Sequence, residues 1–464
     1  MKRTGRDASL ESTANAGILD HIGRYSRLMI ELEIMKVKWS VKMKEWLGQQ
    51  LKSAITSKPG VRSRRWLGLG PAPVANQEMD HIPVPGEVIV YFSDVLNKAY
   101  QLEQWLPTLE RLHEHHGVVL VFRKVPTLRH FRKLTKLPKI YVRRLDDLVN
   151  LYDFNDFTLC LYVNNGMANF QSLSASRLVH VHINHGESDK LSMVSNQAKA
   201  YDKVFVAGPA AIARHNAVLM DFDLDRLVAV GRPQLDLDFE TPLPPFTGRT
   251  IMYAPTWEGE NDANNYTSMD LFGEQIIRAL VALPNTRVIY KPHPRVVTSK
   301  NHAVAEAHLK ICEVLDESNS SGAQHVVAET ENILALFEGV DALFTDVSSV
   351  GLDFLYLHPE RPLVLTDRRD DLSALNSEAP VSKACPVINE PSREAMLSDV
   401  TALLAATSTE SRRKMRSYYF GDRSKGESTR AFLSTIDSLI GNRRGQLEKY
   451  GFHANAADSA DDEQ

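Results

Sequence analysis

Two histidines near the end of a predicted strand have the side chains best suited to proton transfer. His185 follows the apolar run 178–182, which ends in His182, and Gly186 allows the chain to turn directly afterwards. A histidine at such a position can accept a proton from a hydroxyl group near neutral pH. The spacing of three also suits a metal pair, but catalytic zinc sites usually have three protein ligands, and no third ligand with a recognisable pattern accompanies these two. The pattern therefore favours acid–base chemistry without a metal.

A short cationic cluster follows another predicted strand. Lys291, His293 and Arg295 lie within six residues that also contain two prolines, which restrict the backbone. Such groups neutralise phosphate charge and stabilise the charge that develops in a transition state. The alternative is an exposed basic loop without a ligand. We expect this cluster of Lys291, His293 and Arg295 to bind phosphate groups.

A third segment, 341–355, has the pattern of a strand, a polar turn and a helix. Its apolar start is followed by Asp346, Ser348 and Ser349, and a helix is predicted directly after them. Such a turn directs free backbone N–H groups and hydroxyls beyond the carboxyl end of the strand, where open α/β sheets bind ligands and a helix N-terminus favours an anion. Asp346 or Ser348 could instead only cap the helix. We expect all three residues to contact the donor.

Two further polar segments are weaker taken singly. Thr256 and Trp257 follow a predicted strand, where the indole could stack on a base or cover a cleft. Arg232 and Asp236 follow Gly231 at a predicted domain junction. The stronger signal is that all these segments lie at strand ends, and we include Thr256 and Arg232 among the donor-binding residues.

The elements that must position these residues form two successive sets of strands alternating with helices. This order predicts two parallel sheets with crossover helices, hence two doubly wound, Rossmann-like domains of an α/β protein that face a cleft. We place the domains at 86–240 and 241–442 and expect an acidic, flexible tail at 443–464. The expected strands lie at 88–92, 118–122, 159–163, 178–182 and 203–207, and then at 250–254, 287–290, 342–344 and 362–365.

The first 85 residues read as a basic amphipathic helix and a linker rich in proline and glycine. Apolar residues recur every three or four positions within 19–56, and Lys36, Lys38, Lys42 and Lys44 lie in the same stretch. This pattern is typical of an anchor on anionic lipid, although a helix packed on the protein with a solvated basic face would look similar. We expect a cytoplasmic protein, peripheral on the inner face of the membrane.

Composition excludes several other classes. The chain has 464 residues, a formal net charge of −4 and three widely spaced cysteines, which make neither a disulfide framework nor a metal site. The cysteine usage suits a reducing cytoplasm. No window of about 18 uncharged apolar residues predicts a membrane span. No recognition module accompanies the basic stretch, so we do not expect a nucleic-acid partner.

Five motifs together resemble the CDP-glycerol glycerophosphotransferase family of teichoic acid synthesis. The resemblance extends over about 86–439. The motifs are His-Gly-Glu-Ser-Asp-Lys at 185–190, Val-Gly-Arg-Pro-Gln-Leu-Asp at 230–236, Tyr-Ala-Pro-Thr-Trp at 253–257, Lys-Pro-His-Pro at 291–294 and Thr-Asp-Val-Ser-Ser-Val at 345–350.

The resemblance implies a GT-B fold and a peripheral membrane enzyme without a cofactor. Such an enzyme would transfer glycerol phosphate from CDP-glycerol to a hydroxyl of a lipid-linked or polymeric acceptor and release CMP. His185 then matches the proposed general base, His293 the second histidine, and Ser348 and Ser349 the pair that meets the donor pyrophosphate. The chain departs from the family's usual His-Gly-Thr-Pro and Asp-Tyr-Ser-Ser, with His-Gly-Glu-Ser and Asp-Val-Ser-Ser.

Three alternatives stay open at the level of sequence. A GT-B glycosyltransferase that uses a nucleotide sugar, or an enzyme that transfers ribitol phosphate from CDP-ribitol, would need the same cleft. A third alternative is a non-catalytic, membrane-associated scaffold for polymer assembly. The presence of both His185 and His293 favours an enzyme.

Overall fold

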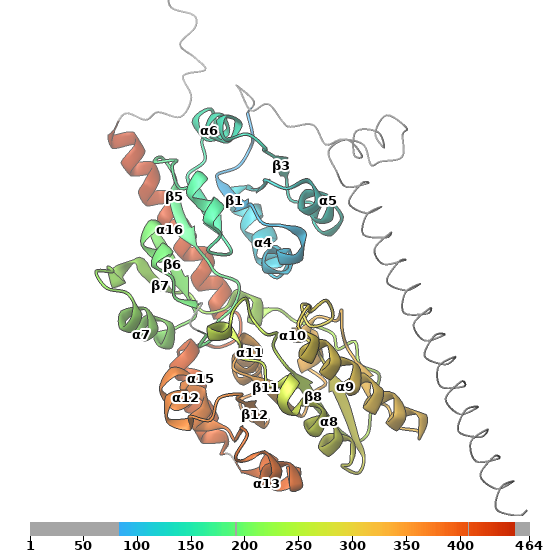
Figure 1. Cartoon of the computed structure of the whole chain (residues 1–464). Coiled ribbons are helices and arrows are strands. Elements are labelled where there is room, and N and C mark those ends of the chain that lie inside the picture. The colour runs from blue at the N-terminus through green and yellow to red at the C-terminus, as the bar shows by residue number, and fades with distance from the viewer. Residues whose placement is uncertain (1–82, 191–192, 407, 451–464) are drawn as a thin grey trace, which may run out of the picture. The chain divides into compact units, whose positions relative to one another are not determined.

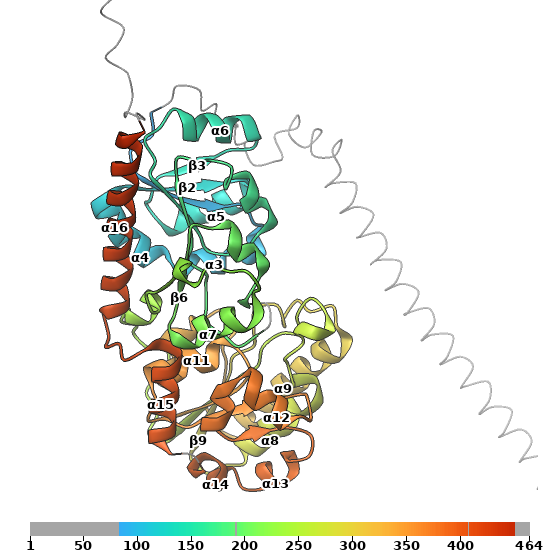
Figure 2. The same ribbon diagram turned by 90° about the vertical axis from the view of Figure 1, so that its left-hand side faces the viewer.

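The first sheet has seven parallel strands in the order β3-β2-β1-β4-β5-β6-β7. The computed structural model describes residues 83–190, 193–406 and 408–450, and Figures 1 and 2 show their arrangement. The central strands are continuous apolar runs whose side chains are all buried, as a sheet covered on both faces requires. The strands are β1 (Val88–Phe92), β2 (Val118–Phe122), β3 (Lys139–Tyr141), β4 (Leu159–Tyr162), β5 (Val179–His182), β6 (Lys203–Val206) and β7 (Leu227–Ala229).

The second sheet has six parallel strands in the order β10-β9-β8-β11-β12-β13. Each of its two faces is covered by a buried apolar cluster. The strands are β8 (Arg249–Ala254), β9 (Thr286–Tyr290), β10 (Val326–Val327), β11 (Ala342–Asp346), β12 (Leu363–Thr366) and β13 (Val387–Ile388). These two sheets confirm the predicted doubly wound α/β architecture.

Helices α3 to α12 lie between the strands in the chain, whereas α13 to α16 follow the last strand. Those of the first half are α3 (Tyr100–Glu103), α4 (Leu106–His116), α5 (Val125–Leu134), α6 (Leu145–Asp153) and α7 (Pro209–Val218). Those that follow are α8 (Glu274–Val281), α9 (His302–Ser320), α10 (Ile333–Phe337), α11 (Ser349–Leu357), α12 (Leu372–Glu378), α13 (Arg393–Ser398), α14 (Val400–Ala405), α15 (Thr409–Phe420) and α16 (Glu427–Lys449). None of the helices in the described part of the chain is long and apolar enough to cross a membrane.

Strand order reverses at one point in each sheet. In the first sheet β1 lies between β2 and β4, and in the second β8 lies between β9 and β11. At such a switch point the crossovers leave toward opposite faces, so the carboxyl ends of the two central strands stay open for a ligand. Both sheets therefore offer a binding position, at β1/β4 and at β8/β11.

The last helix corrects the predicted domain limits. α16 continues to Lys449 and lies along the first sheet (Figure 2). Phe432 of this helix contacts Trp105 and Phe205, with ring centroids 5.4 and 5.8 Å away. Arg443 donates a hydrogen bond to the Ser176 carbonyl at 3.0 Å. Residues 443–449 thus belong to a packed helix and not to the expected tail, and α16 completes the first half and not the second. The predicted helix within 19–56 and the region 451–464 lie outside the described residues.

Candidate active site

His185 lies just beyond the carboxyl end of β5, in a turn that Asn184 stabilises. Asn184 adopts a left-handed conformation with φ of 54°, and its side chain accepts a hydrogen bond from the His185 backbone N–H at 2.8 Å. The imidazole Nδ1 lies 3.1 Å from the Val163 carbonyl. A carbonyl can only accept, so Nδ1 carries the proton and Nε2 has the lone pair, with the Gln101 amide nitrogen 3.3 Å from it. Burial lowers the pKa of His185 to about 4, which keeps the ring neutral at pH 7.

The turn after His185 meets the start of α11 from the second half of the chain. A Cβ atom on Gly186 would lie only 3.4 Å from the Ser349 Cβ and 3.5 Å from its hydroxyl oxygen. Ser348 is the N-cap residue of α11, but its side chain makes no capping hydrogen bond to any described residue. The structure thus brings the predicted base and the predicted anion-binding turn together, and leaves the serine hydroxyls for a role other than capping.

Tyr100 lies between the two predicted catalytic histidines. Its ring centroid is 6.1 Å from that of His185 and 6.2 Å from that of His293, with an edge-on orientation in both cases. His293 also stacks on Trp257 at 6.1 Å. Two histidines more than a hundred residues apart in sequence therefore flank one ring. Tyr100 belongs to no sequence motif and is not among the expected site residues.

His293 has the opposite tautomer to His185. Its Nδ1 lies 3.2 Å from the Arg295 backbone N–H, which can only donate, so the proton of the neutral ring is on Nε2. Burial, together with Lys190, Arg295 and Lys291, lowers the pKa of His293 to about 3. His293 thus presents a hydrogen-bond donor where His185 presents an acceptor.

The two cations next to His293, Lys291 and Arg295, have different interaction partners within the protein. Arg295 lies over the Trp257 ring at 4.1 Å and 3.7 Å from the exposed Glu260 carboxylate. The Lys291 ammonium donates to the Glu329 carbonyl at 2.9 Å, and burial lowers its pKa. These contacts leave much of the positive charge uncompensated.

Lys190 is a further cation that extends from the first half of the chain into the second. Its ammonium donates to the Thr256 hydroxyl at 2.8 Å and lies 5.4 Å from the Tyr266 ring. No carboxylate of the described residues lies within ion-pair distance of it. Burial lowers the pKa of Lys190 to about 8. Lys190 belongs to the motif at 185–190 but is not among the expected site residues, because a lysine next to acidic residues does not by itself indicate a binding site.

Asp346, at the end of β11, is fully buried, and protein donors occupy its carboxylate. One oxygen accepts from the Ser268 backbone N–H at 3.0 Å, the Ser268 hydroxyl at 2.5 Å and the Thr366 hydroxyl at 2.7 Å. The other oxygen accepts from the Thr256 backbone N–H at 2.8 Å. The carboxylate therefore joins the segments that follow β8 and β12, and its oxygens face protein donors instead of the expected ligand.

Arg232 likewise bridges the two halves of the chain. It donates to the Asp353 carboxylate of α11 at 2.8 Å, and both side chains are buried. Burial raises the pKa of Asp353 to about 6, and the Arg232 charge opposes this shift. The same guanidinium nitrogen would lie 3.8 Å from a Cβ on Gly186. Arg232 thus supports both the His185 turn and the first turns of α11.

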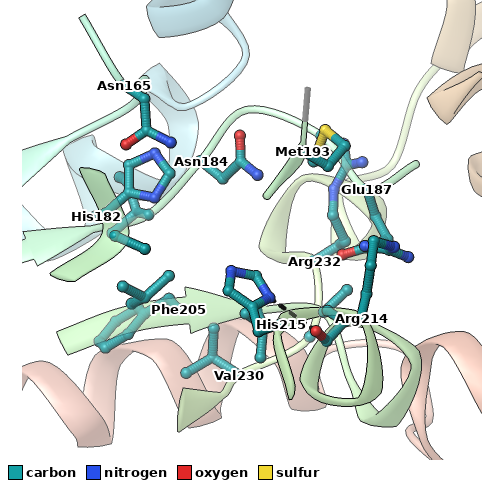
Figure 3. A pocket seen from close by; sticks show the side chains of 18 of the residues that line it. Asn165, His182, Asn184, Glu187, Met193, Phe205, Arg214, His215, Val230 and Arg232 are labelled. Carbon is teal, nitrogen blue, oxygen red and sulfur yellow. Dashed lines mark hydrogen bonds and ion pairs between the residues drawn. The ribbon is translucent and has the colours of Figure 1, made fainter. Parts of the chain in front are cut away.

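A small cavity lies behind the His185 turn (Figure 3). Figure 3 shows His182 and His215 pointing into it, from β5 and α7. Its volume of about 30 Å³ holds one or two waters and is too small for a nucleotide. The side chains of His182, Asn165 and Gln234 each have one buried polar atom there without a hydrogen-bond partner among the described residues. One or two waters in the cavity would supply hydrogen bonds to these atoms. We therefore assign the cavity a structural role behind the His185 turn and not a ligand-binding role.

No three histidine, cysteine or acidic side chains of the described residues are grouped as a metal site would need. The side chains gathered here are instead two neutral histidines, several incompletely paired cations and the start of a helix. Together they can accept one proton, donate one hydrogen bond and bind an anion.

Comparison with known proteins bears on the same region. Residues 158–368 match the family model of CDP-glycerol:poly(glycerophosphate) glycerophosphotransferase. This segment contains every site residue expected from the sequence, from His185 to Ser349, and it excludes Tyr100. A search of curated proteins found no match.

Two solved structures share the fold at low sequence identity. The wall teichoic acid polymerase TagF, in a variant soaked with CDPG, has a TM-score of 0.51 and 14% identity over 88% of this chain and 99% of that chain. A putative UDP-N-acetylglucosamine 2-epimerase from Listeria monocytogenes has a TM-score of 0.52 and 15% identity over 77% of this chain and 98% of that chain. These likenesses confirm the predicted GT-B architecture. The match at 158–368 contains all five motifs, so this segment is similar to the CDP-glycerol:poly(glycerophosphate) glycerophosphotransferase family.

Proposed function

We propose that this chain transfers glycerol phosphate from CDP-glycerol to the hydroxyl group of a lipid-linked or polymeric acceptor and releases CMP. One observation carries the proposal: Gly186, next to the histidine whose Nε2 has the lone pair, lies against Ser349 at the start of α11. A proton acceptor and an anion-binding turn thus meet within the segment that matches the glycerophosphotransferase family.

The two histidines have different roles in this reaction because their tautomers differ. The acceptor oxygen forms a bond to the phosphorus nearer the glycerol, and its proton passes to His185 Nε2. The bond between that phosphorus and the bridging oxygen breaks, and CMP leaves with the electron pair. His293, with its proton on Nε2, donates a hydrogen bond to a phosphoryl oxygen and is not a base.

The pKa of His185 changes in the direction that the reaction needs. In the free protein the ring is neutral, and burial together with Arg232 and Lys98 disfavours the imidazolium. A bound diphosphate brings negative charge next to this turn, which raises the pKa of the histidine. The donor itself therefore makes His185 a stronger base.

Donor charge is held by cations from both halves of the chain. Lys190, Lys291 and Arg295 neutralise the diphosphate, and the N–H groups and hydroxyls of Ser348 and Ser349 complete the site. Phosphoryl transfer depends mainly on positioning and charge stabilisation, which such a set supplies. Thr256 contributes by orienting Lys190, and we assign Arg232 and Asp346 to positioning.

Association with the inner face of the membrane is part of the proposal. It rests on Lys36, Lys38, Lys42 and Lys44 in the sequence, together with a polymeric or lipid-linked acceptor. Co-sedimentation of the full chain with vesicles tests this part of the proposal. The vesicles contain either roughly 30% anionic lipid or none, so that they differ in surface potential. Equal binding to both vesicles, or none to either, would rule this part out.

A donor panel tests the reaction. The purified chain is incubated with CDP-glycerol, CDP-ribitol and UDP- and GDP-sugars, and released nucleotides are identified by mass spectrometry. We expect CMP from CDP-glycerol, with His185→Asn as the inactive control. Release of CMP from CDP-ribitol but not from CDP-glycerol would identify ribitol phosphate as the transferred group. Release of UDP or GDP would favour a glycosyltransferase. No turnover with any donor, together with tight partner binding, would favour a scaffold.

A further inference from the structure

A chain of three polar side chains ends on the reactive nitrogen of His185. Asn164 donates to the Asp94 carboxylate and to the Gln101 side-chain carbonyl, both at 2.8 Å. The Gln101 amide nitrogen then lies 3.3 Å from His185 Nε2. These residues follow β1, β4 and β5, three neighbouring strands at the switch point of the first sheet.

The direction of each hydrogen bond follows from groups that cannot be reversed. The Asp94 carboxylate only accepts, and the Gly166 backbone N–H, 3.1 Å from the Asn164 carbonyl oxygen, only donates. Asn164 therefore has one orientation, with its NH₂ group toward Asp94. The second hydrogen of that NH₂ needs an acceptor, so Gln101 turns its carbonyl to Asn164 and its own NH₂ to His185.

The opposite side of the imidazole gives the same result independently. The Val163 carbonyl only accepts, so His185 Nδ1 is protonated and Nε2 has the lone pair. An N–H donor from Gln101 is compatible with that lone pair and incompatible with an Nε2–H group. Both ends of the network thus favour one tautomer of a neutral ring.

We propose that Gln101 is a positioning residue that, through Asn164 and Asp94, holds His185 with the proton on Nδ1 and the lone pair on Nε2. The importance of Gln101 for catalysis rests on the proposed glycerophosphotransfer. The tautomer of His185, by contrast, is a property of the free protein and can be measured without a donor. When the acceptor hydroxyl donates its proton to Nε2, the imidazolium N–H faces the Gln101 NH₂. This unfavourable pair promotes return of the proton to solvent after transfer.

Two substitutions reverse the network from different positions. In Gln101→Glu a carboxylate faces Nε2, so that nitrogen gains a proton and the lone pair is lost. In Asn164→Asp the new carboxyl shares a proton with Asp94, and its oxygen accepts from Gln101, which must turn its NH₂ toward that oxygen and its carbonyl toward His185. Gln104→Glu, with the same charge change just beyond α3, is the matched control because Gln104 is bonded only to the Tyr100 carbonyl, at 3.5 Å, among the described residues.

The decisive measurement is the imidazole nitrogen spectrum of the full-length protein labelled with ¹⁵N-histidine, without donor. His185, one of sixteen histidines, is assigned by the signals missing in His185→Asn. We expect protonated Nδ1 and unprotonated Nε2 in the wild type and in Gln104→Glu, and protonated Nε2 in both network variants. The charged groups around the ring are Asp94, Lys98 and Arg232, which the substitutions leave in place.

Kinetics give the second readout. We expect kcat of Gln101→Glu to fall by about 10²–10⁴ at neutral pH, the range for a lost general base, with the KM for the donor changed less than about threefold. The acidic limb of its pH–rate profile should move to higher pH by about 1–3 units, the effect of a neighbouring carboxylate. A merely structural role would not move this limb.

The outcomes separate the two proposals. Protonated Nε2 in the wild type, or an unchanged tautomer in a folded Gln101→Glu, overturns the role of Gln101 even if CDP-glycerol is turned over. The expected tautomers without CDP-glycerol turnover would leave the network intact and reject the proposed reaction. The wild-type spectrum alone can reject the role of Gln101 if a variant fails to fold.

Discussion

Lys190→Met is the sharpest test of the donor site because it should change stability and binding in opposite directions. The substitution keeps a long, flexible side chain and removes the ammonium. That ammonium has one hydrogen bond, to the Thr256 hydroxyl at 2.8 Å, and no carboxylate of the described residues pairs with it. An unpaired, mostly buried cation is costly for a folded protein unless an anion binds to it.

The size of both effects follows from the environment of the lysine. Burial lowers the pKa of Lys190 from 10.5 to about 8. At 1.36 kcal/mol per pKa unit, the charged form costs the folded protein about 3 kcal/mol at neutral pH. Removing the charge should therefore stabilise the free protein, by less than this because the Thr256 hydrogen bond is lost too. A charge-assisted hydrogen bond to phosphate contributes about 1.5–3 kcal/mol, so the Kd for CDP-glycerol should rise about 10–150-fold.

Thermal unfolding and calorimetric titration with CDP-glycerol measure the two effects on the same preparations. Lys310→Met is the control, because Lys310 is exposed and pairs with Glu306 at 3.0 Å on α9. We expect this control to change neither quantity appreciably. A Lys190→Met protein that is less stable and binds the donor normally would refute the reasoning, and would make Lys190 a structural link to Thr256.

The pH dependence of the same lysine has a definite sign. The folded-state pKa of about 8 lies below the unfolded value, so between pH 8 and 10.5 the unfolded chain binds more protons than the folded one. Lys190 therefore makes stability rise with pH across this window, and below pH 8 its full cost is present. Donor affinity should fall above pH 8 as the free lysine loses its proton. Both trends should be absent in Lys190→Met.

Three further variants test the remaining parts of the site. His185→Ala should lower kcat by about 10²–10⁴ with donor affinity retained, and unchanged CMP release would reject it as the base. Ser348→Ala combined with Ser349→Ala should weaken CDP-glycerol binding about tenfold or more in calorimetry, and an unchanged Kd would reduce the turn to a helix cap. Asp346→Asn should lower the free energy of unfolding in urea by about 2–4 kcal/mol, because its NH₂ group would face a buried N–H or hydroxyl donor. A stability loss below about 0.5 kcal/mol would show that the carboxylate does not join the strands.

Sequence alone was sufficient for nine of the thirteen strands of the described residues, and it missed the short strands β3, β7, β10 and β13. The runs at 88–92 and 118–122 are apolar at every position, and such runs in alternation with helices have few folds available. His185 follows a strand of the first sheet, and Lys291 and His293 follow a strand of the second. Their positions beyond the carboxyl ends of these strands could be predicted without coordinates.

The residues that sequence analysis missed are those whose role depends on which strands are neighbours. Gln101 follows β1 in the chain, whereas His185 follows β5, and only the order β1-β4-β5 brings them to 3.3 Å. Asp346 is predicted to contact the donor because it ends a strand beside two serines. It is hydrogen-bonded instead to Ser268, which precedes it in the chain, and to Thr366, which follows it. No local sequence pattern predicts these contacts.

The departure of the 185–190 motif from its family changes charge and not the base. Glu187 and Asp189 follow His185 closely, but both pair with Arg214, at 2.8 and 2.9 Å, and Asp189 also accepts from the Tyr419 hydroxyl of α15. The Arg214 guanidinium balances one of these two negative charges, and both carboxylates face protein donors. Lys190, at the end of the same loop, lacks such a partner among the described residues. The two acids face Arg214 and Tyr419, whereas the Lys190 ammonium lies against Thr256, so we expect the difference from the family's usual sequence to affect donor binding more than proton transfer.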